Sequence, residues 1–125
     1  MVKPFDWFAQ EVLEHALTPG GKPVTEQKVS SGSQFIDVTF VPNARHARHL
    51  RRLGLLGRMT AAPCLLEPFH QTPGMEEVLE CVRKQLTHHH RRVLDAGDRK
   101  RPAPEVPWPL WVISSGCWPI LCWCN

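Results

Sequence analysis

Apolar side chains along this chain recur first at the spacing of a helix and then at the spacing of strands. Residues 5–17 place apolar positions on one helical face, and the turn at Pro19–Gly21 predicts the end of that helix. Residues 23–29 and 34–41 then read as two strands. Because Ser30–Ser33 has the glycine and serine content of a hairpin connection, the two strands are predicted to pair antiparallel.

The middle of the chain is predicted to hold a second helix and a third strand. Asn43 suits the N-cap of an Arg- and His-rich helix over residues 44–56, with Gly57 at its C-terminal end. Residues 63–69 read as a strand. Pro68 within it cannot donate a ladder hydrogen bond, which predicts an edge or irregular strand.

A long helix is predicted to begin at Thr72 and Pro73 and to fray around residues 96–97. A proline near the first helical position followed by glutamates is typical of a helix N-terminus. One apolar face of this helix is formed by Met75, Val78, Leu79, Val82 and Leu86. Residues 98–109, with four prolines and several charges, indicate a solvated loop, and residues 110–113 a last buried strand.

These elements predict an α/β fold in which a mixed sheet of about four strands is flanked by helices. The order is helix, strand, strand, helix, strand, helix, strand, in a single domain over residues 1–115. A length of 125 residues with 42% hydrophobic content is enough for one core. Residues 116–125 form an atypical tail that is rich in cysteine and tryptophan.

Positive charge is concentrated in short stretches, although the formal net charge is only +3. Arg45, Arg48 and Arg52 recur at three and four residues, which aligns them as one stripe on a helix. Such a stripe suits backbone phosphates and predicts an anionic partner, DNA first. The alternative is a solvated helix surface, because acidic residues are interleaved with the basic ones elsewhere in the chain.

The chain has no run of 18 apolar residues and no signal-peptide core, which predicts a cytoplasmic protein that does not enter a membrane. The five cysteines are an odd number. Cys64 and Cys81 lie in apolar or amphipathic contexts, where a reduced thiol packs as a small hydrophobic group. A disulfide framework is therefore not expected.

Two carboxylates, Asp37 and Glu67, interrupt apolar strand segments. An unpaired buried carboxylate costs several kcal/mol, so each acid faces solvent or has a partner. Because side chains alternate along a strand, the two acids converge if the faces that carry them meet. Two acids with a third oxygen ligand can hold Mg²⁺, which polarises a phosphate and activates a water. The alternative is that Asp37 is a solvent-facing or salt-bridged strand residue.

The order of elements and five short segments resemble a known group of proteins. The segments are Lys3–Asp6, Ser33–Asp37, Leu55–Arg58, Cys64–Phe69 and Leu110–Ser114. The resemblance, over roughly residues 3–115, is to the PD-(D/E)XK nuclease-like superfamily. Within it, the chain is similar to uncharacterised bacterial proteins near the recombination-promoting nuclease and putative transposase families.

This resemblance implies a restriction-endonuclease-like fold and Mg²⁺-dependent hydrolysis of DNA. Asp37 and Glu67 would be the metal ligands, with Glu14 or Glu11 of the first helix assisting. In the superfamily a lysine two residues after the glutamate orients the attacking water. Phe69 stands at that position, and Lys28 on the neighbouring strand is the candidate for supplying the cation.

Three interpretations of the function therefore stay open. The first is an active Mg²⁺-dependent DNA endonuclease. The second is a catalytically degenerate, non-catalytic module that binds nucleic acid or protein with the same fold. The third is a truncated or frameshifted product without a function of its own, since Cys and Trp are crowded from Cys117 onward.

Two further clusters invite a chemical interpretation and do not support one well. His88, His89 and His90 are consecutive, and on a helix they point about 100° apart, so they cannot all bind one ion. Cys122 and Cys124 are too closely spaced for a zinc knuckle. The serines and cysteines of the tail also resemble the composition of a lanthipeptide core, which is kept as an alternative.

Overall fold

The computed structural model describes residues 4–29 and 34–114. The predicted hairpin connection at Ser30–Ser33 and the cysteine-rich tail, with the interpretations offered for that tail, lie outside the described residues. The helices and strands are α1 (Pro4–Leu17), β1 (Gly21–Lys28), β2 (Phe35–Pro42), α2 (Ala47–Arg51), α3 (Leu55–Met59), β3 (Cys64–Phe69), α4 (Met75–Asp98) and β4 (Leu110–Ser114). Two 3₁₀ turns, η1 (Thr18–Gly20) and η2 (Ala44–His46), precede β1 and α2.

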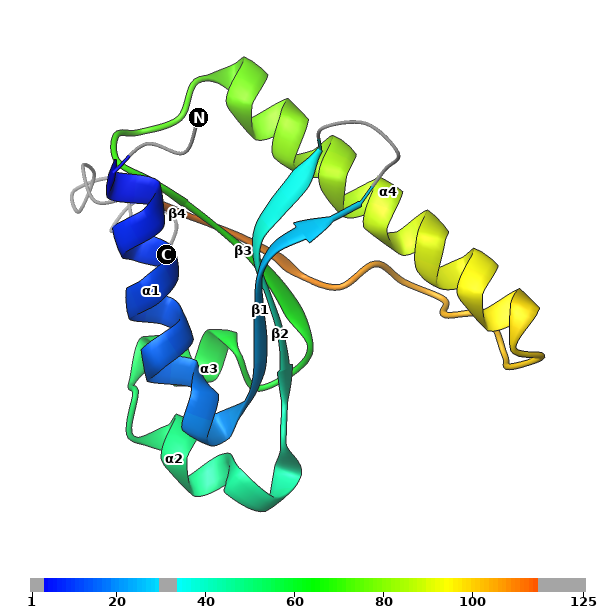
Figure 1. The fold of residues 1–125 in the computed structure, drawn as a ribbon, viewed down its shortest axis with the longest axis horizontal. Helices are drawn as coiled ribbons and strands as arrows, with labels where there is room; N and C mark the ends of the chain where they lie inside the picture. Colours follow the sequence, from blue (N-terminus) through cyan, green and yellow to red (C-terminus); the bar gives the residue numbers. More distant parts are fainter. Residues whose placement is uncertain (1–3, 30–33, 115–125) are drawn as a thin grey trace.

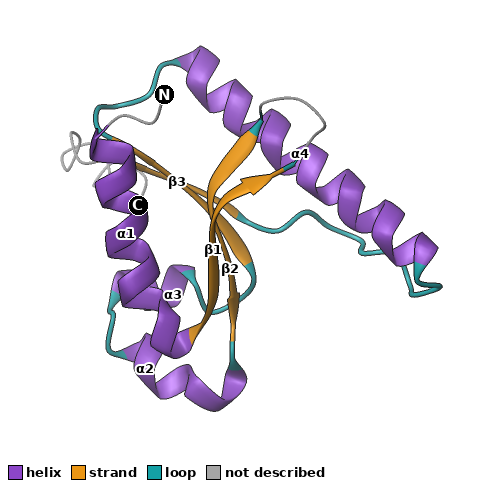
Figure 2. Cartoon of the chain, in the orientation of Figure 1, coloured by secondary structure: helices purple, strands orange, loops and turns teal. Residues whose placement is uncertain are grey.

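The four strands form one mixed sheet in the order β1-β2-β3-β4 (Figure 1). β1 pairs with β2 antiparallel, as predicted, and β2 pairs with β3 antiparallel. β3 and β4 run parallel, because the long helix α4 connects them. The predicted α/β class with a four-stranded mixed sheet is therefore confirmed (Figure 2).

Of the two predicted placements of the strand that holds Pro68, edge or irregular, the edge placement is wrong. β3 lies inside the sheet, between β2 and β4. Its pairing with β2 covers only Cys64–Leu66, so Pro68 lies beyond that ladder and its missing N–H interrupts none of the ladder's bonds. Pro68 still pairs in register with Ile113 of β4.

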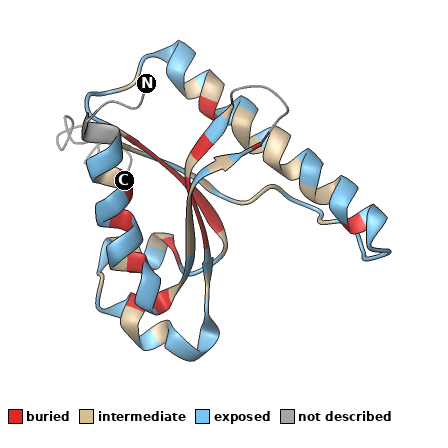
Figure 3. Ribbon diagram, in the orientation of Figure 1, coloured by how far each residue is buried: buried red, intermediate tan, exposed pale blue. Residues whose placement is uncertain are grey.

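The main core lies between the sheet and α1, where buried side chains are concentrated (Figure 3). α1 contributes Leu13 and Leu17, which are one helical turn apart. The strands contribute Val38, Phe40, Cys64 and Leu66, and α2 adds Leu50. A smaller cluster of Val29, Ile36 and Leu65 packs against Trp108 and Leu110.

The single helix predicted over residues 44–56 is broken into η2, α2 and α3. Asn43 caps its start as expected, because the side-chain oxygen accepts a hydrogen bond from the Arg45 N–H at 3.0 Å. The break falls at Gly54, whose φ of 63° lies in the left-handed region that glycine tolerates. Gly57 is inside α3 rather than at a helix end. A Cβ there would lie 1.8 Å from the Leu50 carbonyl oxygen, so glycine permits the close approach of α3 to α2.

α4 begins at Met75, one residue after its N-cap Gly74, and Pro73 therefore precedes the helix. The Glu77 carboxylate accepts a hydrogen bond from the Gly74 N–H at 3.3 Å, which satisfies one orphan donor of the first turn. The C-terminal half of α4 extends beyond the sheet (Figure 1). Among the described residues, no helix combines the length and apolar content needed to cross a membrane.

Candidate active site

The two acids singled out in the sequence meet where β2 separates from β3. The ladder between these strands ends with Val38 opposite Leu66. Continuing the same register by one residue sets Asp37 opposite Glu67, a position at which Cβ atoms lie about 5 Å apart. The two side chains are hydrogen bonded to each other. The predicted convergence of the two acids is thus what the strand register produces.

Glu67 is buried, with only 2% of its side chain exposed. Burial is the main reason that the pKa of its carboxyl rises from 4.5 to about 8. The negative charge of Asp37 and the hydrogen bond between the two acids raise this pKa further, while Lys84 lowers it. The raised pKa means that the two carboxyl groups retain a shared proton to higher pH than isolated acids would.

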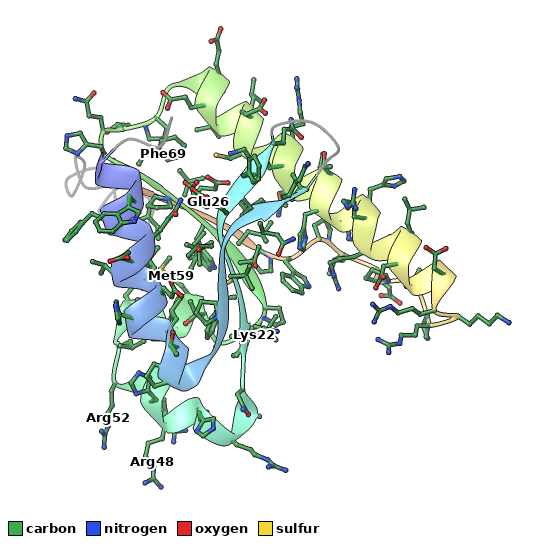
Figure 4. All side chains as sticks on the ribbon, in the orientation of Figure 1. Lys22, Glu26, Arg48, Arg52, Met59 and Phe69 are labelled. Carbon is green, nitrogen blue, oxygen red and sulfur yellow. The ribbon has the colours of Figure 1, made fainter. Side chains whose placement is uncertain are left out.

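A lysine from α4 approaches this pair. The Nζ atom of Lys84 lies 3.4 Å from Oε1 of Glu67, and the lysine side chain is 19% exposed. The resemblance predicts a lysine at the end of β3, where Figure 4 shows Phe69. The cation at this site therefore comes from the helix that follows the strand.

A polar residue from α1 contacts the other acid. Gln10 is buried, and its amide Nε2 lies 3.4 Å from Oδ1 of Asp37. Gln10 shares a helical face with Leu13 and Leu17, so the core contacts of α1 hold the amide toward the sheet. The site thus receives side chains from two strands and from both long helices.

Other residues predicted for the site lie elsewhere. Glu11 and Glu14 are exposed on α1, and it is Gln10 that reaches Asp37. Lys28 is exposed near the end of β1, opposite Phe35. Their assisting roles remain predictions, and the contacts described above favour Gln10 and Lys84.

Cys81 is a buried neighbour of the acid pair. It lies one helical turn before Lys84, and burial, followed by the charge of Glu67, raises the pKa of its thiol to about 11. The thiol is therefore protonated at neutral pH and is not a nucleophile. Cys64, in the core, is held protonated by burial in the same way.

The described residues contain no group of three or more His, Cys, Asp or Glu side chains able to hold a metal ion. Two carboxylates are nevertheless a common protein contribution to a Mg²⁺ site, because this ion keeps several waters and uses substrate phosphates as ligands. Asp37 and Glu67 provide two oxygen donors of that kind, while Gln10 turns its amide nitrogen toward Asp37.

The arginine stripe lies at the other end of β2, around α2. Arg45, Arg48 and Arg52 are all exposed, and they line a shallow depression of about 520 Å³ formed by residues 44–52. Arg48 and Arg52 project away from the body of the molecule (Figure 4). The sequence between residues 38 and 66 contains no acidic residue, so the segment that forms this depression carries only positive charge.

The consecutive histidines face different surroundings. His88 packs against the Trp108 ring, with centroids 4.9 Å apart, and Arg92 lies 4.7 Å from the same ring. Burial, and then the charge of Arg92, lower the pKa of His88 to about 4. His90 is exposed. Within the described segments the three do not gather around one point, as their helical spacing predicts.

Sequence reasoning missed Lys84 and Gln10, although each left a signal. Gln10 is a polar residue on the same face of α1 as the apolar residues Leu13 and Leu17. Lys84 shares a helical face with Cys81 and His88, which is a second possible inner face of α4. Comparison of the chain with protein-family models, with curated proteins and with solved structures finds no match. The likeness to PD-(D/E)XK nucleases therefore remains a prediction.

Proposed function

We propose that the protein hydrolyses phosphodiester bonds of DNA with Mg²⁺ held by Asp37 and Glu67. One observation carries the proposal: the buried Glu67 and the half-buried Asp37, from neighbouring strands, are hydrogen bonded to each other, with a lysine 3.4 Å from Glu67. Burying a carboxyl group beside a second one is costly, and such arrangements cluster at functional sites.

The charges at the site fit a divalent cation. Two ionised acids and one lysine leave one excess negative charge, and the raised pKa of Glu67 is consistent with a proton that balances this charge. A divalent cation would replace that proton and favour ionisation of both carboxylates. When bound, Mg²⁺ would polarise a phosphate oxygen and lower the pKa of a bound water.

The protein's own residues would position the reacting groups. Gln10 holds Asp37 in place through its amide, and this supporting contact fixes the orientation of the carboxylate. Lys84, at 3.4 Å from Glu67, keeps that carboxylate oriented and offers a positive charge to a nearby phosphate oxygen. In the proposal Lys84 takes the role for which the sequence suggested Lys28.

The arginine surface would hold the DNA backbone at a distance from the site. Pro42 is five positions after Asp37 on β2, which corresponds to roughly 17 Å of strand. Successive phosphates along one DNA strand are spaced roughly 3.4 Å apart in rise, so this separation spans about five nucleotides. Arg45, Arg48 and Arg52 would then contact phosphates on one side of the scissile bond.

The test is cleavage of plasmid DNA by the purified chain with Mg²⁺ or Mn²⁺. Asp37→Asn and Glu67→Gln are expected to reduce the rate at least 100-fold, because each removes a charged metal ligand. Glu105→Gln removes an exposed acid in the loop before β4 and should leave the rate unchanged. Cleavage that survives Asp37→Asn would sink the proposal, since it would come from another site or from a contaminant.

A second candidate is a binding module without catalysis, and the exposed arginines of the acid-free segment 44–52 favour it. In that case the chain retains DNA at low salt in the presence of Mg²⁺ and never nicks it. The Asp37→Asn and Glu67→Gln variants would then bind DNA as tightly as the wild type. The two candidates therefore differ in the same assay.

A further inference from the structure

The apolar face predicted for α4 is exposed. Met75, Leu79 and Leu86 are 74%, 58% and 54% exposed, and Val82 is 37% exposed. The apolar spacing of this helix therefore does not mark a buried face at these four positions. Figure 3 shows α4 with mostly exposed and half-buried positions along its length.

A different face of α4 is fastened to the rest of the protein. Cys81 is buried, Lys84 contacts Glu67, and the Gln85 amide donates a hydrogen bond of 2.8 Å to the Trp108 carbonyl. Arg92 covers the Trp108 ring two turns after Gln85. At 100° per residue these positions are centred roughly 140° around the helix from the apolar stripe. The stripe is thus left without a partner among the described residues.

The spacing of the stripe is that of a coiled-coil seam. Met75, Leu79, Val82 and Leu86 follow one another at intervals of four, three and four residues, and Val93 continues the repeat after seven more. The four lie within about 60° of one another around the helix, which is the narrow seam of a two-helix contact. Such a seam matches a second helix with the same spacing.

The charges beside the seam match a second copy in the antiparallel orientation. On one flank Glu76 lies near the helix start and Arg83 lies two turns later. When two copies of residues 75–86 cross head to tail, Glu76 of each meets Arg83 of the other. A parallel pair would instead place the acidic first turns of both copies, which hold Glu76 and Glu77, side by side.

The ion pair that Arg83 makes within its own helix does not oppose a contact with Glu76 of a second copy. Arg83 lies 3.7 Å from Glu80 on the same helix, and both side chains are exposed, so the pair contributes little. We propose that two copies of the chain associate through the Met75, Leu79, Val82 and Leu86 stripe of α4, packed antiparallel. Lys84 faces the opposite side of the helix, so association would leave the candidate active site open.

The experiment is sedimentation of the full chain under reducing conditions over a range of concentrations. The wild type is expected to be a dimer, and Leu79→Lys or Leu86→Lys to raise the dissociation constant at least tenfold. Leu55→Lys is the matched control, because Leu55 is 65% exposed on α3, away from the stripe. A wild type that stays monomeric up to about 100 µM overturns the proposal, as does a dimer insensitive to both α4 variants.

Charge reversal tests the orientation independently. Glu76→Arg alone and Arg83→Glu alone each place like charges together in the antiparallel dimer and should each weaken it about tenfold. An equimolar mixture of the two variants restores both pairs and should recover the dimer. Failure of the mixture to associate contradicts the antiparallel arrangement. If the stripe is instead covered by another part of the same chain, Leu79→Lys lowers the thermal stability of a monomer, which also contradicts the proposal.

Discussion

Lys84 on α4 and Glu67 on β3 are 17 residues apart in the chain, and Nζ of the first lies 3.4 Å from Oε1 of the second. This contact joins the long helix to the strand that carries the buried acid. It gives the carboxyl pair its nearby positive charge, although the expected lysine position is occupied by Phe69. The relationship also makes the stability of the fold depend on pH.

Lys84→Met is expected to destabilise the protein more at pH 9 than at pH 6. At pH 6 Glu67 is protonated and loses only a hydrogen-bond partner, which costs about 1 kcal/mol. At pH 9 the variant leaves a buried carboxylate without its cation, which costs about 3 kcal/mol or more. Urea unfolding at both pH values measures the difference. Lys28→Met, which changes an exposed lysine, should alter stability by less than about 0.5 kcal/mol at either pH.

Glu67 is predicted to make the wild type less stable as pH rises from about 4.5 to about 8. Its pKa is higher in the folded protein than in the unfolded chain, so the folded state holds a proton that the unfolded state releases. The contribution of this proton to the free energy of unfolding is fully present below the pKa of the unfolded chain and is lost as pH rises through about 8. Between these two pKa values the free energy of unfolding falls by about 1.4 kcal/mol per pH unit. Unfolding free energies of Glu67→Gln should lack this slope. An equally steep decline in that variant would assign the effect to other groups.

Mg²⁺ is expected to stabilise the protein more at pH 8.5 than at pH 6, because it competes with the proton shared by Asp37 and Glu67. Melting temperatures with Mg²⁺ and with chelator at both pH values check this expectation. Calorimetry at pH 7 in buffers of different ionisation enthalpy should show release of about one proton per ion bound. Asp37→Asn should show neither effect, and a pH-independent shift would indicate binding elsewhere on the surface.

Gly57→Ala should destabilise the fold by about 2 kcal/mol or more. The new methyl group would overlap the Leu50 carbonyl, so α3 must move away from α2. Gly97→Ala is the matched control, since nothing lies within 4 Å of a Cβ at that helical position. The control should be neutral or stabilising by up to about 1 kcal/mol. Equal effects of the two substitutions would contradict the close helix contact.

Replacing Arg45, Arg48 and Arg52 with alanine is expected to weaken DNA binding and its salt dependence together. Each lost phosphate contact lowers the slope of log K against log salt by about 0.9, so three should lower it by about 3. Changing Arg91, Arg99 and Arg101 to alanine removes the same charge from an exposed region of mixed sign. A similar change of slope in both triple variants would mean that net charge, rather than the α2 surface, controls binding.

Much of the local structure followed from the sequence, because it depends on neighbouring residues. The Asn43 cap and the antiparallel pairing of β1 with β2 need only short-range patterns. The break at Gly54 was not predicted, since helical spacing continues across it and the left-handed conformation depends on how α3 packs. That the strand containing Pro68 lies inside the sheet was not predicted for a similar reason, because its neighbour β4 is 40 residues further along the chain.

The order of residues along the chain is enough to show that two carboxylates interrupt apolar strands and that a basic segment lies between them. What surrounds those acids depends on contacts between distant parts of the chain. Register sets Asp37 opposite Glu67, and the packing of α1 and α4 brings Gln10 and Lys84 to them. The same packing turned the apolar stripe of α4 outward, because contacts with Glu67 and Trp108 fix the opposite face of the helix. Periodicity shows that a helix has an apolar face, but contacts between distant residues determine which face is buried.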